Sequence, residues 1–490
     1  MTLGVFHVRL ELLPKESVQA IKETAFEILE TIGFSYKHPR ALELLENIGA
    51  NVNFKEEVAK IPRELVLEVL RKVNKAYTIE PLDSENRISI GDGKLKVTMC
   101  SEVYLVDYIK KERRLGLSED CLKSITLGNA LDNISVVTPF IIPSDVPIWA
   151  TDVRGYKLLF TYSRKPCSGW IYSPESARCI IEMAKRIVGG GEELRRRKIV
   201  GYGAEPTSPL QLSRHAIEIM IEMAKYNLPI SATGSMIMLG TTGPMSIAGS
   251  LSLLVAEVLA GIVLTYLLSP KSPVSFSTSI HVFDQRTLLC SFGAPENILA
   301  SLAGVQIAKS FGLPCFCNVG LSDSLMPDFQ CGFEKALGVA LVIAAGAEWI
   351  GSQGIVGADQ GASWEQLVID NEWINVINRI LGSFDVTEET LALDVIRKVG
   401  IGGTFLGQKH TLKYMKSEVW YPDLFERKAW EQWIELGGKD VLQRAHERVE
   451  EILKESYPQE PVIDRALVRE LETLERDYLK ERMRTNKLRA

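Results

Sequence analysis

The spacing of apolar and polar residues changes about 135 residues into this 490-residue chain. Before that point, apolar residues recur with a helical period in three segments, 16–32, 41–48 and 62–73. Two alternating runs then flank Gly91-Asp92-Gly93, which predicts a β-hairpin, and residues 103–109 predict a further strand. The N-terminal part is therefore predicted to combine helices with a hairpin.

From residue 135 onward, short strand-like segments alternate with longer helical ones. The strand-like segments are 135–138, 166–171, 198–203, 229–233, 273–279, 314–319 and 348–351. The helical segments are 153–162, 174–187, 212–225, 246–267, 296–311, 329–345 and 364–380. Repeated strand–helix units predict parallel strands joined by right-handed crossovers.

This repetition fits either an open doubly wound α/β sheet or a closed TIM-type (β/α)8 barrel. The glycine-rich stretch at Gly189-Gly190-Gly191 follows a helix and not a strand, so it is not a nucleotide loop. We therefore predict the barrel, with residues 94–102 as the source of its eighth strand.

Three regions follow from this prediction. Residues 1–133 form N-terminal helices and a β-hairpin packed on the barrel, residues 134–385 form the barrel core, and residues 386–490 form a C-terminal helical extension. Within the extension, 426–435 is an aromatic-rich helix, whereas 441–454 and 466–484 are highly charged helices.

Composition narrows the class of protein. Hydrophobic residues make up 46% and charged residues 24%, as in ordinary globular proteins. The net charge of −6 argues against a nucleic-acid partner, because displacing counterions from phosphates needs a basic surface. The N-terminal residues lack a signal-peptide pattern, and we expect the eight scattered cysteines to be reduced, so we expect a cytoplasmic protein.

One apolar segment, 246–268, is long enough to span a membrane. Glu257 lies near its centre and several serine and threonine residues interrupt it. We therefore expect a buried helix of the barrel and no membrane partner. Such helices also explain the slightly positive mean hydropathy of +0.05.

In a (β/α)8 barrel, function is located at the carboxyl ends of the strands. The loops after the predicted strands at 166–171 and 198–203 contain Trp170, Tyr172, Tyr202 and Glu205. Aromatic faces beside a carboxylate are the usual recognition elements for a quaternary ammonium group. The alternative is that these aromatic residues simply close the mouth of the barrel.

Further candidates lie in the loops after the later strands. Asp323 is the second carboxylate near a strand end, so it joins Glu205 as a candidate catalytic residue, whereas Asp328 is expected to cap the next helix. Asn318 and Gln353 are candidate substrate-binding residues in the same kind of loop.

The segment after residues 273–279 contains His281, Phe283 and Arg286, also candidate substrate-binding residues. His281 or Arg286 would suit a carboxylate on the substrate, although a lone histidine is often structural. The stretch from Gly240 to Ser246 is either an anion-binding nest at a helix N-terminus or a tight turn.

A metal site is the first alternative chemistry. Cys315, Cys317, Cys331 and His281 could approach one another, and the Cys-x-Cys pair on a strand would share one face. However, no CxxC pair or HExxH motif accompanies them, and no nucleophile elbow is present. We therefore expect core cysteines and no bound metal.

Several blocks of this chain resemble the trimethylamine methyltransferase family. They are Ala25-Phe-Glu-Ile-Leu-Glu-Thr-Ile-Gly33, Leu239-Gly-Thr-Thr-Gly-Pro-Met-Ser-Ile-Ala-Gly249, Ser322-Asp-Ser-Leu-Met-Pro-Asp-Phe-Gln-Cys-Gly-Phe-Glu334 and Gly402-Gly-Thr-Phe-Leu-Gly-Gln-Lys-His-Thr-Leu412. Their order and spacing extend over nearly the whole chain. The resemblance implies a (β/α)8 barrel that moves a methyl group from a methylated amine to the Co(I) corrinoid of a small partner protein, with no cofactor bound tightly to this chain.

One departure from the family refines the expected substrate. The trimethylamine enzymes carry pyrrolysine, whereas this chain has only the twenty standard residues. It resembles the members without pyrrolysine, which act on quaternary amines such as glycine betaine. We therefore expect a quaternary amine:corrinoid methyltransferase that forms a homo-oligomer and receives the corrinoid protein at the barrel mouth. Two alternatives remain open: a catalytically silent betaine-binding barrel and a zinc-dependent corrinoid methyltransferase.

Overall fold

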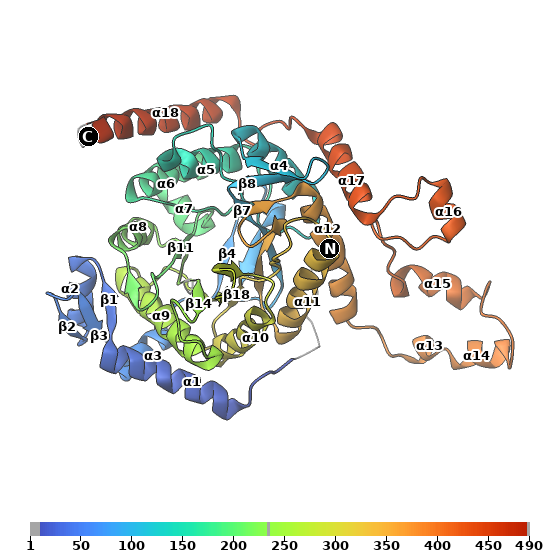
Figure 1. The fold of residues 1–490 in the computed structure, drawn as a ribbon, viewed down its shortest axis with the longest axis horizontal. Helices are drawn as coiled ribbons and strands as arrows, with labels where there is room; N and C mark the ends of the chain where they lie inside the picture. Colours follow the sequence, from blue (N-terminus) through green and yellow to red (C-terminus); the bar gives the residue numbers. More distant parts are fainter. Residues whose placement is uncertain (1–9, 233–235, 488–490) are drawn as a thin grey trace.

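The computed structural model describes residues 10–232 and 236–487. A parallel six-stranded sheet lies at its centre, and helices surround it (Figure 1). In spatial order the strands are β11 (Tyr202–Ala204), β13 (Ile230–Ala232), β15 (Phe276–Thr278), β18 (Cys315–Cys317), β19 (Trp349–Gln353) and β6 (Lys96–Met99). The predicted α/β class with parallel strands is confirmed, and so is the predicted contribution of residues 94–102 to the sheet.

Two further segments extend the sheet beyond β6. Single parallel bridges join Thr98 to Val136 and Val137 to Cys167, so eight parallel segments follow one another. Within the described ranges, no ladder joins Cys167 to β11. The sheet is therefore not closed in the structure, and the closed barrel remains a prediction.

Most of the helices around the sheet lie close to the ranges predicted for them. These are α5 (Thr151–Tyr162), α6 (Pro174–Val188), α8 (Arg214–Ala224), α9 (Ile247–Leu268), α10 (Pro295–Ser310), α11 (Phe329–Ala345) and α12 (Trp364–Leu381). Helices α4 (Ser118–Ala130) and α7 (Gly191–Arg197) were not predicted. Side-chain caps explain several of the boundaries: Ser173 accepts a hydrogen bond from the Ser176 amide, and Ser363 accepts one from the Gln366 amide.

Helix α9 is the candidate membrane segment noted in the sequence. It is the one helix in the described part of the chain that is long and apolar enough to cross a membrane, but 83% of its apolar window is buried inside the protein. Glu257 at its centre has no exposed surface and accepts hydrogen bonds from the Ser208 hydroxyl and the Leu210 amide, each at 2.8 Å. Its carboxylate therefore anchors the loop before α8 from within the core.

The N-terminal region packs its helices against this core. They are α1 (Lys15–Glu27), which continues as a π-helical turn (Ile28–Ile32), α2 (Pro39–Asn47) and α3 (Arg63–Lys72). A small sheet has the strand order β12 (Gln211–Leu212), β1 (Phe34–Tyr36), β3 (Val58–Lys60) and β2 (Asn51–Asn53). The buried Tyr36 hydroxyl donates to the Ala260 carbonyl of α9 at 3.0 Å, which ties this sheet to the central helices.

The predicted hairpin around Gly91-Asp92-Gly93 is wrong. Strand β5 (Ile88–Ile90) pairs antiparallel with β4 (Tyr77–Ile79), whereas β6 enters the central sheet beside β19. All four residues of β6 are buried, which a half-exposed hairpin strand would not allow. Instead of closing a hairpin, the turn at Gly91 is anchored by Glu348, whose Oε2 accepts a hydrogen bond of 2.9 Å from the Gly91 amide.

The remaining strands lie around the central sheet. The predicted strand at 103–109 is present as β8 (Tyr104–Asp107), which pairs antiparallel with β9 (Glu112–Leu115) in a sheet with β20 (Ile355–Val356) and β21 (Gly361–Ala362). Two smaller sheets complete the set: β7 (Ser101–Glu102) with β10 (Phe140–Ile141), and β14 (Ile237–Leu239), β16 (Ile280–Asp284) and β17 (Leu289–Ser291). Short 3-10 turns lie at Ser84–Asn86 and Ile148–Ala150.

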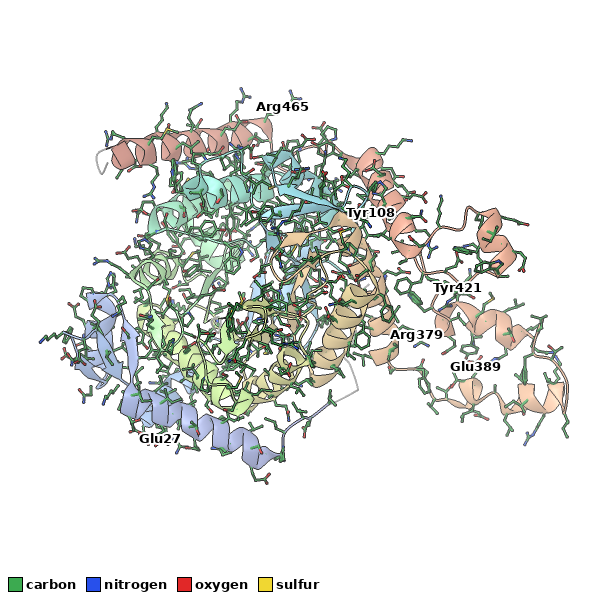
Figure 2. All side chains as sticks on the ribbon, viewed as in Figure 1. Glu27, Tyr108, Arg379, Glu389, Tyr421 and Arg465 are labelled. Atoms are coloured by element: carbon green, nitrogen blue, oxygen red, sulfur yellow. The ribbon has the colours of Figure 1, made fainter. Side chains whose placement is uncertain are left out.

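The C-terminal extension has two parts. Helices α17 (Val441–Ser456) and α18 (Arg465–Lys487) lie along the outside of the ring, where Glu475 of α18 forms ion pairs with Arg154 and Lys157. Helices α13 (Glu388–Leu391), α14 (Leu393–Val399), α15 (Lys409–Glu418) and α16 (Trp430–Glu435) reach away from the ring (Figure 1). We call residues 383–440 the arm; Figure 2 labels Glu389 and Tyr421 on it and Arg379 at its base.

Candidate functional site

A cavity of about 290 Å³ is enclosed by the strands of the central sheet, and residues of these strands line it. Small residues leave this space open: Ser277 in β15 and the flanking Ser275 and Ser279 all line it, together with Gly201, Gly203 and Gly351. Side chains two residues apart on a strand point to the same face. In most (β/α)8 barrels this interior is filled by Val, Ile and Leu, so a serine-lined interior indicates space for a ligand.

The two ends of the cavity differ in chemistry. At the carboxyl ends of the strands it is lined by three carboxylates, Glu102, Glu205 and Asp359, and by Trp170. Tyr202, the first residue of β11, also lines the cavity. At the amino ends it is lined by Tyr77, Ile79, Lys198, Ile199 and Pro229. We call the first end the acidic mouth, defined by Glu102, Glu205, Asp359 and Trp170.

Glu205 directly follows β11 and projects into the cavity. The surrounding protein removes most of the water from its carboxyl group, and the charge of Asp359 lies nearby; together they raise the pKa of Glu205 to about 7. At neutral pH this group is therefore poised between its neutral and anionic forms. A cation beside it would shift it towards the anion.

Glu102 and Asp359 form a hydrogen-bonded carboxyl pair in the same mouth. Glu102 lies at the end of β7, directly after β6, and is buried, whereas Asp359 lies in the loop before β21 with a left-handed backbone φ of 60°. Burial raises the pKa of both carboxyl groups, and the adjacent Asp359 charge raises that of Glu102 further. Two carboxyl groups in contact do not both ionise readily, so the pair shares a proton at neutral pH.

A neutral polar group lies beside the acidic mouth. The Asn318 amide donates to the Ser279 hydroxyl at 3.3 Å, and its Oδ1 accepts from the Ser352 hydroxyl at 2.9 Å. All three side chains line the cavity. These hydrogen bonds fix the orientation of the amide and present neutral donors and acceptors to a ligand.

Four of the predicted site residues come together at the cavity: Trp170, Tyr202, Glu205 and Asn318. Two other predicted site residues, Tyr172 and Gln353, do not line the cavity. Tyr172 is partly exposed, with its backbone amide donating to Asp152 at 2.8 Å, and Gln353 is buried, with its amide donating to the Gly351 carbonyl at 2.6 Å.

The three candidates on and after β16 also lie outside the cavity lining. His281 is fully buried between the Ser279 hydroxyl at 3.0 Å and the Asn297 amide at 3.4 Å, and burial lowers the pKa of the imidazole to about 3. It is therefore neutral at physiological pH. Phe283 lies beyond it in β16, and the Arg286 side chain is 90% exposed and ion-paired with Asp284 at 2.9 Å.

Asp323, the second candidate catalytic residue, lies away from the cavity as well. Its carboxylate accepts hydrogen bonds of 2.5 Å from the Ser291 hydroxyl and the Phe292 amide, so it holds the end of β17. The expected cap at Asp328 is confirmed, because its Oδ1 accepts from the Cys331 amide at 2.9 Å. The stretch at Gly240 is a tight turn, closed by a 3.0 Å hydrogen bond from its amide to the Gly243 carbonyl.

The cysteines form no common site. Cys315 and Cys317 share a face of β18, as predicted, with 3.9 Å between their sulfur atoms. Cys331 lies elsewhere, where its thiol donates to Gln366 at 3.2 Å. Across residues 10–232 and 236–487, no three His, Cys, Asp or Glu side chains lie close enough together to hold a metal ion.

Sequence reasoning missed Glu102 and Asp359. Glu102 ends the segment 94–102 that was predicted as the eighth strand, so applying the strand-end rule to that segment would have included it. Asp359 had no such signal, because it lies several residues beyond the end of β19 in an irregular loop.

A parallel α/β fold with a ligand-sized cavity at the carboxyl ends of its strands is typical of an enzyme acting on small molecules. This chain belongs to the trimethylamine methyltransferase family, whose sequence model, described as "Trimethylamine methyltransferase (MTTB)", matches residues 6–486. Membership of this family indicates that the protein is an enzyme that transfers a methyl group.

Two curated relatives illustrate the family. The chain is 31% identical over 448 residues to the trimethylamine methyltransferase MttB of Desulfitobacterium hafniense, an alignment that covers 91% of this chain and 90% of that protein. It is 29% identical over 467 residues to a glycine betaine methyltransferase of the same species, covering 94% and 96% of the two chains.

Among solved structures, the fold is similar to the crystal structure of the Methanosarcina barkeri monomethylamine methyltransferase MtmB. The TM-score is 0.56 at 11% identity, with 92% of this chain and 89% of that chain covered. The likeness at this identity concerns the fold alone.

Proposed function

We propose that this protein transfers a methyl group from a quaternary methylated amine to the Co(I) corrinoid of a partner protein. The observation that carries the proposal is the acidic mouth of the cavity, where the aromatic ring of Trp170 and three carboxylates converge in a member of a methyltransferase family. A positively charged nitrogen is attracted both to the face of Trp170 and to the negative charge of Glu205 and Asp359.

The chemistry asks little of the protein beyond positioning. The attacking Co(I) supplies the electron pair of the new cobalt–carbon bond, and the electron pair of the broken carbon–nitrogen bond stays on nitrogen. A quaternary ammonium substrate thus leaves as a neutral tertiary amine and needs no proton. The residues of the mouth need only orient the N–CH₃ bond and exclude water. We also propose that the eight parallel segments close into a barrel around this space.

The methyl acceptor would approach from outside. A corrin ring with its substituents is far larger than a cavity of about 290 Å³, so only the amine fits inside. The same end of the sheet carries exposed apolar side chains, which we call the rim: Leu288, Leu289, Leu325, Phe329 and Phe333. Large exposed apolar groups beside a cavity are typical of a docking surface, and we propose that the corrinoid protein binds there.

We further propose that the chain self-associates through the arm. Leu424 is its only buried side chain, while Phe384, Ile401, Leu406 and Trp430 are all more than two-thirds exposed. Its helices are at most ten residues long, and helices this short are marginal unless they pack against something. Acidic and basic residues nearly balance along the arm, so two copies would meet without net repulsion.

A cytoplasmic location is part of the same proposal. All eight cysteines are free thiols, and none lies in a disulfide. Both free thiols and a Co(I) acceptor persist only in a reducing compartment.

The direct test is to mix the purified protein with Co(I) cobalamin, or with a corrinoid protein carrying it, and a panel of quaternary amines. Formation of methylcobalamin together with one equivalent of tertiary amine is expected. If no quaternary amine in the panel yields methylcobalamin with either acceptor, the proposal is wrong. Binding of an amine without any transfer would instead support the catalytically silent barrel.

A further inference from the structure

The charged groups of the cavity lie at opposite ends. Three carboxylates line the acidic mouth, and among the lining residues that the structure describes, Lys198 is the only cation. Lys198 lies at the amino ends of the strands, and its ammonium group donates to the Arg195 carbonyl beyond the cavity. A ligand whose positive end lies in the mouth therefore meets no positive charge beside it.

The residues that would have bound a substrate carboxylate are located elsewhere. His281 is buried behind Ser279 and neutral, and Arg286 is on the exposed turn between β16 and β17, paired with Asp284. Lys335, whose charge is felt at Glu102, is fully buried and paired with Asp370. Neither the neutral His281 nor the paired Arg286 and Lys335 is therefore available to bind an anion in the cavity.

We propose, building on the proposed function, that the substrate is a methylated ammonium cation without a carboxylate group, such as a choline-type amino alcohol or a tetraalkylammonium ion. A betaine would bring its carboxylate within a few ångströms of Glu205 and Asp359. Like charges this close repel each other, and they do so more strongly at a protein surface than in bulk water. The mouth thus selects for the cation and against a neighbouring anion.

The rest of the cavity suits a neutral polar tail. Asn318, Ser279 and Ser352 present an amide and hydroxyls beside the mouth. A hydroxyl group both donates and accepts hydrogen bonds, so it can pair with these groups without adding charge. This favours an alcohol over an acid at the uncharged end of the substrate.

Calorimetric titration of the full chain, without any corrinoid, tests the inference. The ligands are choline, tetramethylammonium, glycine betaine and 3,3-dimethylbutanol, the uncharged analogue of choline. Choline or tetramethylammonium is expected to bind at least tenfold more tightly than either glycine betaine or the uncharged alcohol. Equal or tighter binding of glycine betaine overturns the inference, and so does the absence of binding by all four ligands.

A charge-neutral variant separates electrostatic selection from shape. Glu205→Gln keeps the size of the side chain and is expected to weaken choline binding about tenfold while narrowing its advantage over glycine betaine. Glu192→Gln, at a side chain 86% exposed on α7, is the matched control and is expected to bind like the parent protein. An unchanged choline-to-betaine ratio in Glu205→Gln overturns the assignment.

Failure of the inferred substrate class can be distinguished from failure of the proposed reaction. If choline binds selectively but no methyl group reaches Co(I), the substrate class stands and the reaction is wrong. If methyl groups reach Co(I) from glycine betaine faster than from choline, the reaction stands and the inferred substrate class is wrong.

Discussion

Lys335 of α11 and Asp370 of α12 form an ion pair with 3.1 Å between Nζ and Oδ2, and neither side chain has any exposed surface. Lys335 also donates to the Ile355 carbonyl at 3.1 Å, and Asp370 accepts from the Gly354 amide at 2.7 Å. The pair therefore holds the chain just before the loop that places Asp359 in the cavity.

Removing one partner of this pair should destabilise the protein strongly. In Asp370→Ala, the buried Lys335 ammonium loses its counter-charge, and a buried pair broken in this way typically costs about 3–5 kcal/mol. Glu68→Ala is the control, because its ion pair with Lys72 is exposed and screened by water, so its loss should change stability much less. Chemical denaturation measures both variants, and equal losses would contradict a structural role for the buried pair.

Binding of a cationic substrate should depend on pH through Glu205. Because the pKa of Glu205 is raised to about 7, its carboxylate is mostly protonated at pH 6 and mostly charged at pH 8. Cation affinity should therefore rise roughly tenfold across this interval, as one charge–charge attraction is gained. Calorimetric titrations at several pH values measure it. Glu205→Gln should bind more weakly at pH 8 and lose this rise; the same rise in the variant would assign it to another group.

The stability of the folded protein should respond to pH through Glu102 in the opposite sense. Burial and the Asp359 charge raise the pKa of Glu102 above its unfolded value, so folding takes up a proton there. This contribution is fully present below about pH 4.3 and is lost as pH rises, by up to about 1.4 kcal/mol per pH unit. Glu102→Gln should therefore have a melting temperature that falls less between pH 5 and pH 8.5. If the melting temperatures of the parent protein and of Glu102→Gln fall equally with pH, this role of Glu102 is excluded.

The rim should matter only when the corrinoid is carried by a protein. Phe329 and Phe333 of α11 expose their rings and stack with 6.4 Å between centroids, so Phe333→Glu places a charge at the centre of the proposed docking surface. The variant should slow methyl transfer to a corrinoid protein by tenfold or more, and leave transfer to free cobalamin unchanged. Losing both activities equally would show a folding defect, and losing neither would place the docking surface elsewhere.

Self-association should depend on the tip of the arm. Ile401 and Leu406 are among its most exposed apolar residues, and a charge there would be buried without a partner in an oligomer. Ile401→Glu with Leu406→Glu should therefore lower the mass measured by light scattering, whereas Gln408→Glu on the same arm should not. A monomeric parent protein, or an unchanged mass in the double variant, would contradict the proposed contact.

The elements of the fold that could be predicted are those with local signals. Helices α6, α11 and α12 begin next to Ser173, Asp328 and Ser363, whose side chains cap them. Their apolar residues also recur with the period of a helix. The hairpin error arose because an alternating run does not say which strand it pairs with. Lys96–Met99 is buried on both faces although Lys96 and Thr98 are polar, and its partner β19 lies about 250 residues later in the chain.

The candidate site was partly predictable for a related reason. The strand-end rule located Glu205 and Asn318, which directly follow β11 and β18, and Trp170, which lies shortly after the bridge at Cys167. Tyr202 also lines the cavity, although it begins β11 and does not follow it. The rule failed to place His281 and Arg286, because after Ser279 the chain continues into the β16–β17 hairpin and turns these side chains away. The position of Asp359 depends on a loop in which Ala358 and Asp359 have left-handed backbone conformations, and no local sequence pattern predicts them.

The central claim is that the methyl group of a quaternary amine passes to cobalt. The most direct measurement uses choline with deuterated N-methyl groups and the corrinoid protein in its Co(I) state, followed by mass spectrometry of the cobalamin and of the amine. The account predicts deuterated methylcobalamin and an equal amount of dimethylaminoethanol, both formed at least tenfold more slowly by Glu205→Gln. It would be contradicted if no quaternary amine, choline or betaine, gave labelled methylcobalamin while the protein remained folded.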